Sequence, residues 1–257
     1  SIRDTFILLC TLLDYEHPAL DEMKNTVPKS VDALMQSLLD LVDIKTDDLS
    51  SDSIDVELKC PECNQINTHE VFYIHVDPSA SKPNAFVGGD ISCLSCGEYT
   101  DLTPTPRGDL TITLKFVKFT HLAQDNPDIP SPFHFGKMSI ADGKVLQPGE
   151  ILEHYQEILA MNPFRVEALL SLGNFYLIVN RTRKAQVYYE KCIEVDKSCP
   201  EAALQLAIIL DEKQGRKREA LQVLKDSLEH RNSWQFCRLI KLSEKEFRQH
   251  FMDKYHE

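Results

Sequence analysis

The sequence predicts a multidomain α+β protein in which a small antiparallel β domain precedes an α-helical array. Apolar residues alternate with a period of two in several segments between residues 54 and 119, which is typical of strands. From residue 150 the apolar period becomes helical and continues to the end of the chain. The chain has 257 residues, 42% of them hydrophobic, so it is long enough for one or two domains with their own cores.

Residues 1–50 are predicted to form an acidic helical lead-in. Two runs of apolar residues recur there at helical spacing: Phe6, Leu9, Leu12 and Leu13, then Leu34, Leu38, Leu41 and Val42. The stretch 43–52 is short and acidic, a composition typical of linkers. Because the chain begins at Ser1 without an initiator Met, we expect it to be a fragment or a processed chain.

Residues 54–120 are predicted to form the β domain. Four segments have the alternation or the β-branched and aromatic composition of strands: residues 54–59, 71–76, 85–92 and 110–119. Gly88 and Gly89 interrupt the third of them. We therefore expect a small, mostly antiparallel sheet.

Two Cys-x-x-Cys units in this domain predict a metal site. Cys60 and Cys63 form the first unit, and Cys93 and Cys96 form the second, with 29 residues between the units. Two intervening residues let both sulfurs turn onto one ion, and Gly97 supplies the backbone freedom that the turn requires. Four thiolates suit tetrahedral Zn²⁺ and leave no open position for water, so we expect a structural ion. Two disulfides, free thiols and an iron–sulfur cluster are the alternatives.

The placement of these cysteines between strands resembles the zinc-ribbon class over residues 54–120. The resemblance implies a small β domain whose folding depends on its ion. His69 and His75 lie nearby in the sequence, but four cysteines already complete a tetrahedral shell. Neither histidine is therefore predicted to be a ligand.

Residues 121–148 are predicted to be a Pro-rich loop or linker. Its prolines are Pro127, Pro130, Pro132 and Pro148. We expect Phe133 and Phe135 to pack this segment against the protein.

Residues 149–257 are predicted to form helical repeats with capping helices at the C-terminus. The segment repeats itself after 34 residues: Leu169, Leu172, Gly173 and Tyr176 align with Ala203, Leu206, Ala207 and Leu210. After one extra residue, Ala185, Tyr189 and Cys192 align with Ala220, Leu224 and Ser227. Residues 151–161, closed by Asn162 and Pro163, match a preceding second helix. Ser243 and Glu246 form a capping-box pattern at the start of a last helix.

This pattern resembles the tetratricopeptide repeat family over residues 149–230, although Lys197 and Ala203 depart from its usual proline and large aromatic residue. A plain bundle of helical hairpins is the alternative. The resemblance implies paired helices, with Gly173 and Ala207 at the closest contacts, and a concave surface that binds a peptide or a protein domain. The positions implied to line that surface are Glu167, Leu170, Asn174, Leu177, Glu201, Leu204, Ile208 and Asp211.

Two equivalent turns of the repeats are basic and are predicted to stack into one basic edge. Their residues are Arg181, Arg183 and Lys184, then Arg216, Lys217 and Arg218. The alternatives are ordinary solvated turn charge and docking of an acidic surface, which could be residues 40–55 of the same chain.

The charge distribution disfavours nucleic acid as a general partner. Residues 1–53 hold 11 acids and 4 bases, residues 54–150 hold 13 and 7, and residues 151–257 hold 16 and 17. The first 150 residues therefore repel phosphate, and the remainder is close to neutral.

Taken as a sequence, the chain predicts a non-enzymatic adaptor that contains Zn²⁺ and binds a protein or peptide. It contains no nucleophile elbow, P-loop, dinucleotide fingerprint or H-E-x-x-H motif. It has no run of eighteen apolar residues, and its scattered cysteines indicate a reducing setting, so we expect no membrane insertion and an intracellular, cytoplasmic location. The alternatives are a nucleic-acid-associated zinc-ribbon protein and an accessory region of a larger enzyme.

Overall fold

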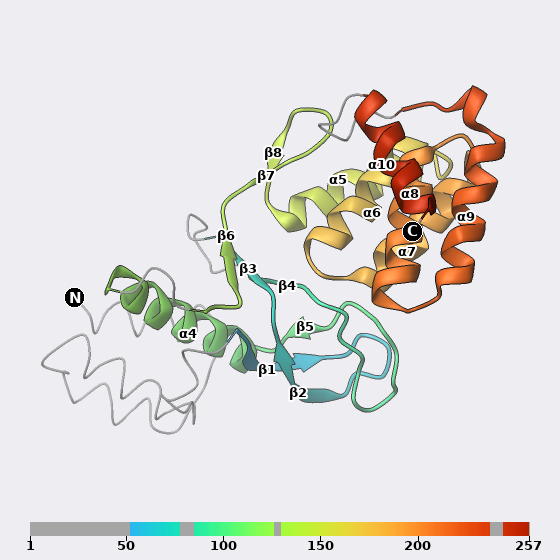
Figure 1. The fold of residues 1–257 in the computed structure, drawn as a ribbon. Coiled ribbons are helices and arrows are strands. Elements are labelled where there is room, and N and C mark those ends of the chain that lie inside the picture. Colours follow the sequence, from blue (N-terminus) through green and yellow to red (C-terminus); the bar gives the residue numbers. More distant parts are fainter. Residues whose placement is uncertain (1–51, 78–84, 126–129, 237–243, 257) are drawn as a thin grey trace, which may run out of the picture. The chain divides into compact units, whose positions relative to one another are not determined.

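The computed structural model describes residues 52–77, 85–125, 130–236 and 244–256. The chain divides into two compact units, Ser1–Gly136 and Lys137–Glu257, and each is described by itself (Figure 1). The predicted lead-in, residues 1–50, lies outside the described residues. Within the described ranges, no helix has both the length and the apolar composition that crossing a membrane requires.

The first sheet of the first unit has the strand order β2-β1-β5 and is antiparallel. Its strands are β1 (Ile54–Lys59), β2 (Ile66–Val71) and β5 (Thr103–Pro104). The alternation in β1 buries Ile54, Val56 and Leu58 and turns Asp55 and Lys59 to solvent. The prediction of a strand at residues 54–59 is confirmed.

The second sheet has the order β4-β3-β6, and its strands are β3 (Ile74–Val76), β4 (Ala85–Val87) and β6 (Phe133–Phe135). β3 pairs antiparallel with β4 and parallel with β6, so this sheet is mixed. Phe133 lies in the core cluster with Ile74, Val76 and Val87, whereas Phe135 is 63% exposed. Only one of the two predicted phenylalanines therefore packs.

The fourth predicted strand, residues 110–119, is wrong: the segment lies in helix α4 (Pro106–Asp125). Residues 110–115 are all buried, so this part of the helix has no solvent-exposed face. Without such a face, polar residues do not recur there at helical spacing. Ile112 nevertheless joins the core, and Phe116 and Phe119 pack against it, at helical spacing. A period-two pattern of β-branched residues was thus compatible with a helix that is buried around its first half.

The start of α4 had a local signal that the strand prediction overlooked. Thr105 precedes Pro106, and its Oγ1 accepts a hydrogen bond from the Gly108 amide at 3.1 Å, as an N-cap does. Gly108 also lies so close to the Glu57 carbonyl oxygen of β1 that a side chain would not fit there. The cap starts the helix, and the glycine lets it pack against the sheet.

The segment predicted as a linker, residues 121–148, contains ordered elements instead. It supplies the last turn of α4, strand β6 and a hairpin of β7 (Met138–Ser139) and β8 (Val145–Leu146). Asp142 in the hairpin lies 3.1 Å from His154 Nε2 and 3.2 Å from Lys144 Nζ. The contact with His154 ties the hairpin to α5, the first helix of the second unit.

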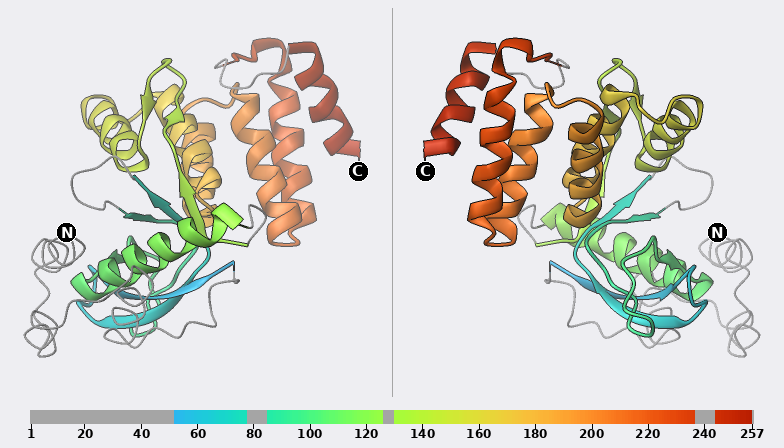
Figure 2. Two further views of the ribbon diagram at one scale, coloured as in Figure 1. Left: turned by 90° about the vertical axis from the view of Figure 1, so that its left-hand side faces the viewer. Right: turned by 90° about the vertical axis from the view of Figure 1, so that its right-hand side faces the viewer.

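The second unit consists mainly of helices. They are α5 (Pro148–Met161), α6 (Val166–Ile178), α7 (Thr182–Val195), α8 (Pro200–Ile208), the π-helical η2 (Ile209–Lys213), α9 (Lys217–Glu229), the short η3 (Arg231–Ser233) and α10 (Glu244–His256). α6 packs with α7 and α8 with α9 as two helical pairs (Figures 1 and 2). The π-helical turn at the end of α8 accommodates the extra residue that separates the two sequence repeats.

The contact between α6 and α7 centres on Gly173. A Cβ at this position would lie 2.5 Å from Tyr189 Cε1, so any side chain here would overlap the tyrosine ring unless the two helices moved apart. Tyr189 is fully buried, and its hydroxyl donates to Asn174 Oδ1 at 2.7 Å. The sequence-based expectation of a close contact at Gly173 is confirmed.

The last helix, α10, packs on the repeats through an aromatic cluster. The Trp234 ring lies 5.0 Å from the Phe251 ring, and Phe236 lies 5.4 Å from Phe247. Lys254 at its C-terminal end forms ion pairs with Asp211 and Glu212 at 3.0 and 3.1 Å. Its predicted cap, Ser243, lies outside the described residues.

Candidate functional site

The four cysteines come together in two loops of nearly identical backbone geometry. The Cys60 amide bonds to the Gln65 carbonyl at 3.0 Å, and the Cys93 amide bonds to the Glu98 carbonyl at 2.9 Å. The residue after the second cysteine of each unit has a positive φ, +58° at Asn64 and +77° at Gly97. Asparagine is the residue that tolerates this left-handed conformation best after glycine, so each unit can close the same turn.

The distances between the sulfurs fit a tetrahedral ion. Cys60 Sγ lies 3.8 Å from Cys96 Sγ, and Cys63 Sγ lies 3.6 Å from Cys93 Sγ, with all four sulfurs within 4.8 Å of one another. A zinc–sulfur bond of about 2.3 Å gives a tetrahedron with edges of about 3.8 Å. A disulfide needs sulfurs about 2.05 Å apart, so neither of these pairs is a disulfide in this structure.

Backbone amides prepare one of the thiols for metal binding. The amides of Cys96 and Ser95 point at Cys93 Sγ and lower the pKa of this thiol to about 6. The Ser95 nitrogen lies 3.4 Å from the sulfur. Because a metal binds the thiolate rather than the thiol, this loop favours the form of Cys93 that coordinates an ion.

Both nearby histidines stay away from the cysteine cluster. Among the described residues, the four cysteines form the one group of three or more His, Cys, Asp or Glu side chains whose ligand atoms are close enough to share an ion. His69 on β2 and His75 on β3 are buried, and burial lowers the pKa of His69.

Three of the eight positions implied to line a concave repeat surface are buried. Leu170 is 0% exposed, and Glu201 and Leu204 are each 2% exposed, so they are packing residues in this structure rather than free binding surface. Their burial is a correction to the predicted surface. It arises because helices in so short an array are covered by neighbouring chain on more than one side.

The other five positions are exposed or half-buried. Glu167 is exposed, and Leu177 and Ile208 are half-buried. Asn174 accepts the Tyr189 hydrogen bond, and Asp211 pairs with Lys254, so both also stabilise the fold. Ile178, which the sequence reasoning missed, is 60% exposed beside Leu177.

The predicted basic edge is smaller than expected. Arg181 is 7% exposed at the start of α7 and is therefore not surface charge. The Arg216 guanidinium pairs with Glu219 in the next turn, which raises the pKa of Arg216. Lys184 lies over the Tyr176 ring at 5.5 Å.

The three remaining bases of that edge, Arg183, Lys217 and Arg218, are exposed. The two turns do lie at the same end of the repeats, because Gln214 Nε2 donates to Gln186 Oε1 at 2.6 Å.

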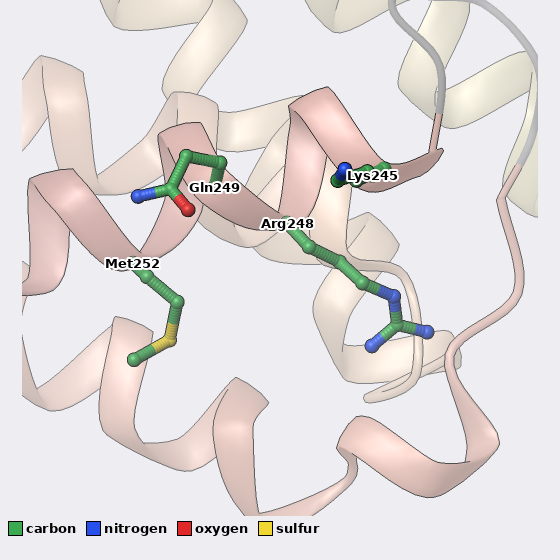
Figure 3. A pocket seen from close by; sticks show the side chains of 4 residues that line it. All are labelled: Lys245, Arg248, Gln249 and Met252. Atoms are coloured by element: carbon green, nitrogen blue, oxygen red, sulfur yellow. The ribbon is translucent and has the colours of Figure 1, made fainter.

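A shallow pocket lies on α10, lined by Lys245, Arg248, Gln249 and Met252 (Figure 3). Arg248 stacks over the Trp234 ring at 5.0 Å. These four lining side chains include no acid, histidine or cysteine.

Comparison with known proteins supports the repeat assignment. A family model of the tetratricopeptide repeat matches residues 166–199, which are helices α6 and α7 and the loop after them. No curated protein matches the chain. The second unit therefore contains a tetratricopeptide repeat, and the first contains four cysteines that can hold one metal ion.

Proposed function

We propose that this protein is a non-enzymatic adaptor that binds a protein or peptide through its helical repeats and contains one structural Zn²⁺. The observation that carries the proposal is the matched repeat at residues 166–199, followed by a second helical pair, α8 with η2 and α9, that is built in the same way. Repeats of this kind stack into extended surfaces that bind other proteins.

The ion would be held by Cys60, Cys63, Cys93 and Cys96 as in a zinc ribbon. The sulfur separations of 3.6 and 3.8 Å support a tetrahedral ion. Four protein ligands leave no position for a water nucleophile, which favours a structural role. The ion would hold the two cysteine loops together. A sheet of only three short strands buries little apolar surface, so this link would contribute to the stability of the first unit.

The partner surface is proposed to centre on the exposed part of α6 and the end of α8. Leu177 and Ile178 lie at the C-terminal end of α6, and Ile208 lies at that of α8. Glu167 and Asn174 continue this set toward the start of α6, which gives the surface an apolar end and a polar end.

Charge supports a protein partner over a nucleic acid. The 44 residues from Cys60 to Thr103 contain a single base, Lys82, and six acids. Phosphate binding depends on clustered Lys and Arg, so this segment of the first unit would repel nucleic acid.

The proposal is tested with the full chain in its native cells. A photo-reactive residue placed at Ile178 should cross-link a protein, and Ile178→Glu in a second strain should abolish co-purification of that same protein. Val187→Glu is the matched control, because Val187 is a 45% exposed apolar residue on the second helix of the same repeat. Equal co-purification by both variants would contradict the proposed surface.

The metal part is tested separately by elemental analysis of the purified chain. About one zinc per chain is expected, since one closed set of four thiolates is present. A chain that folds without metal would contradict it.

A further inference from the structure

Large apolar residues are exposed around the four-cysteine centre, two of them at equivalent positions of its two loops. Leu94, between Cys93 and Cys96, is 68% exposed. Ile66 and Tyr99 stand three residues after the second cysteine of their respective loops and are 52% and 44% exposed. We call the two loops with these residues the knuckle end.

The two loops of the knuckle end form one surface. Asn67 Nδ2 donates to Ser95 Oγ at 2.9 Å, which joins the residue after Ile66 to the residue after Leu94. Thr100 donates to Glu62 across the same pair of loops. A ligand that covers Leu94 therefore meets residues of both loops.

The charge at the knuckle end is negative. Glu62 and Glu98 are exposed there, and a centre of four thiolates with one divalent ion is itself anionic. The exposed Lys59 pairs with Ile66 across β1 and β2, and no base of the described residues lies between Cys60 and Thr103, so these two acids and the centre outweigh a single base. A surface that combines exposed aliphatic and aromatic residues with negative charge complements a segment that carries Lys or Arg next to aliphatic residues.

We propose that the knuckle end is a second docking surface, separate from the repeats, and that it binds a protein segment in which basic and aliphatic residues adjoin. Leu94 is its apolar anchor, and the acidic residues with the anionic centre select the basic partner. This inference rests on the proposed function in one respect, since it takes the centre to contain its ion.

The test is a selection from a displayed library of random peptides against the zinc-loaded full chain, with the Leu94→Ser chain as the counter-selection. Peptides enriched on the wild type alone should carry adjoining Lys or Arg and Leu, Ile or Val. One such peptide, labelled, should bind Leu94→Ser at least about tenfold more weakly in fluorescence anisotropy, because the variant no longer buries a leucine side chain in the complex. Binding of Glu98→Lys should also weaken, mainly at low salt.

Phe135→Ser is the matched control, because Phe135 is 63% exposed on β6, in the other sheet of the same unit. It should bind the peptide as the wild type does. No enrichment over the counter-selection, or enriched peptides without basic residues, would overturn the inference. So would self-association of the wild type that Leu94→Ser abolishes, since the surface would then be a contact between copies.

Zinc content of each variant separates this inference from the proposed function. If the wild type retains its zinc but selects no peptide, only the docking surface is overturned. A wild type that folds without zinc overturns the metal centre, and with it the basis of this inference.

Discussion

Replacing Gly173 by Ala should destabilise the second unit, although alanine is the better helix former. The added Cβ would lie 2.5 Å from Tyr189 Cε1 and 2.7 Å from Cδ1. The ring cannot move aside freely, because it is fully buried and its hydroxyl is bonded to Asn174. Overpacking of this kind costs about 1–3 kcal/mol, and loss of the hydrogen bond costs about 1 kcal/mol more.

Helix propensity offsets about 1 kcal/mol of that cost. The net expectation is a loss of about 1–3 kcal/mol in the free energy of unfolding. Urea unfolding followed by tryptophan fluorescence measures it well, because Trp234 is the single tryptophan and packs within the second unit. Gly149→Ala is the control, since Gly149 is also helical and a Cβ there meets nothing within 4 Å. It should be neutral or slightly stabilising.

A double-mutant cycle identifies the cause. In a Tyr189→Val background the clashing ring atoms are absent, so Gly173→Ala should cost nothing or stabilise the helix. A coupling energy of at least about 1 kcal/mol is expected, within the range found for contacting residues in other proteins. Equal costs of Gly173→Ala in both backgrounds would refute the reasoning.

Three predictions concern the first unit. In Cys63→Ser, elemental analysis should find no zinc and the β sheet of the first unit should be unfolded, while the unfolding curve measured at Trp234 stays unchanged. If the Trp234 transition were lost together with the sheet, the two units would not unfold independently. Asn64→Val should cost about 1–2 kcal/mol, because its φ of +58° is left-handed, and should weaken zinc binding in chelator competition, whereas Asn64→Gly should not. Burial raises the pKa of Asp109 from 3.8 to about 6, so its contribution to stability is complete below about pH 4 and is lost as the pH rises through 6. Asp109→Asn should remove that dependence and stabilise α4 at pH 7 by at most about 3 kcal/mol, measured by amide hydrogen exchange; unchanged protection would contradict it.

The four-cysteine cluster shows which features can be predicted from local sequence. The four cysteines lie in two short loops, and the turn that each loop makes follows from its own spacing and from the residue after its second cysteine. Gly97 was recognised for this reason. Asn64 holds the equivalent conformation and could have been recognised by the same argument. The repeat was also readable from sequence, because the contact at Gly173 recurs with its neighbours at a fixed period.

Features that depend on residues far apart in the sequence are visible only in the folded structure. Residues 110–119 form a helix because Thr105 caps it and Gly108 packs on β1, and its burial around the first half hid the helical period. The amino acids at 170 and 204 are compatible both with a binding surface and with a core, and the packed helices place them in the core. The four cysteines that can hold one ion and the period of the repeats follow from the sequence alone, since both depend on residues close along the chain. Burial is set by segments far apart in the chain, so only the folded structure separated packing residues from surface.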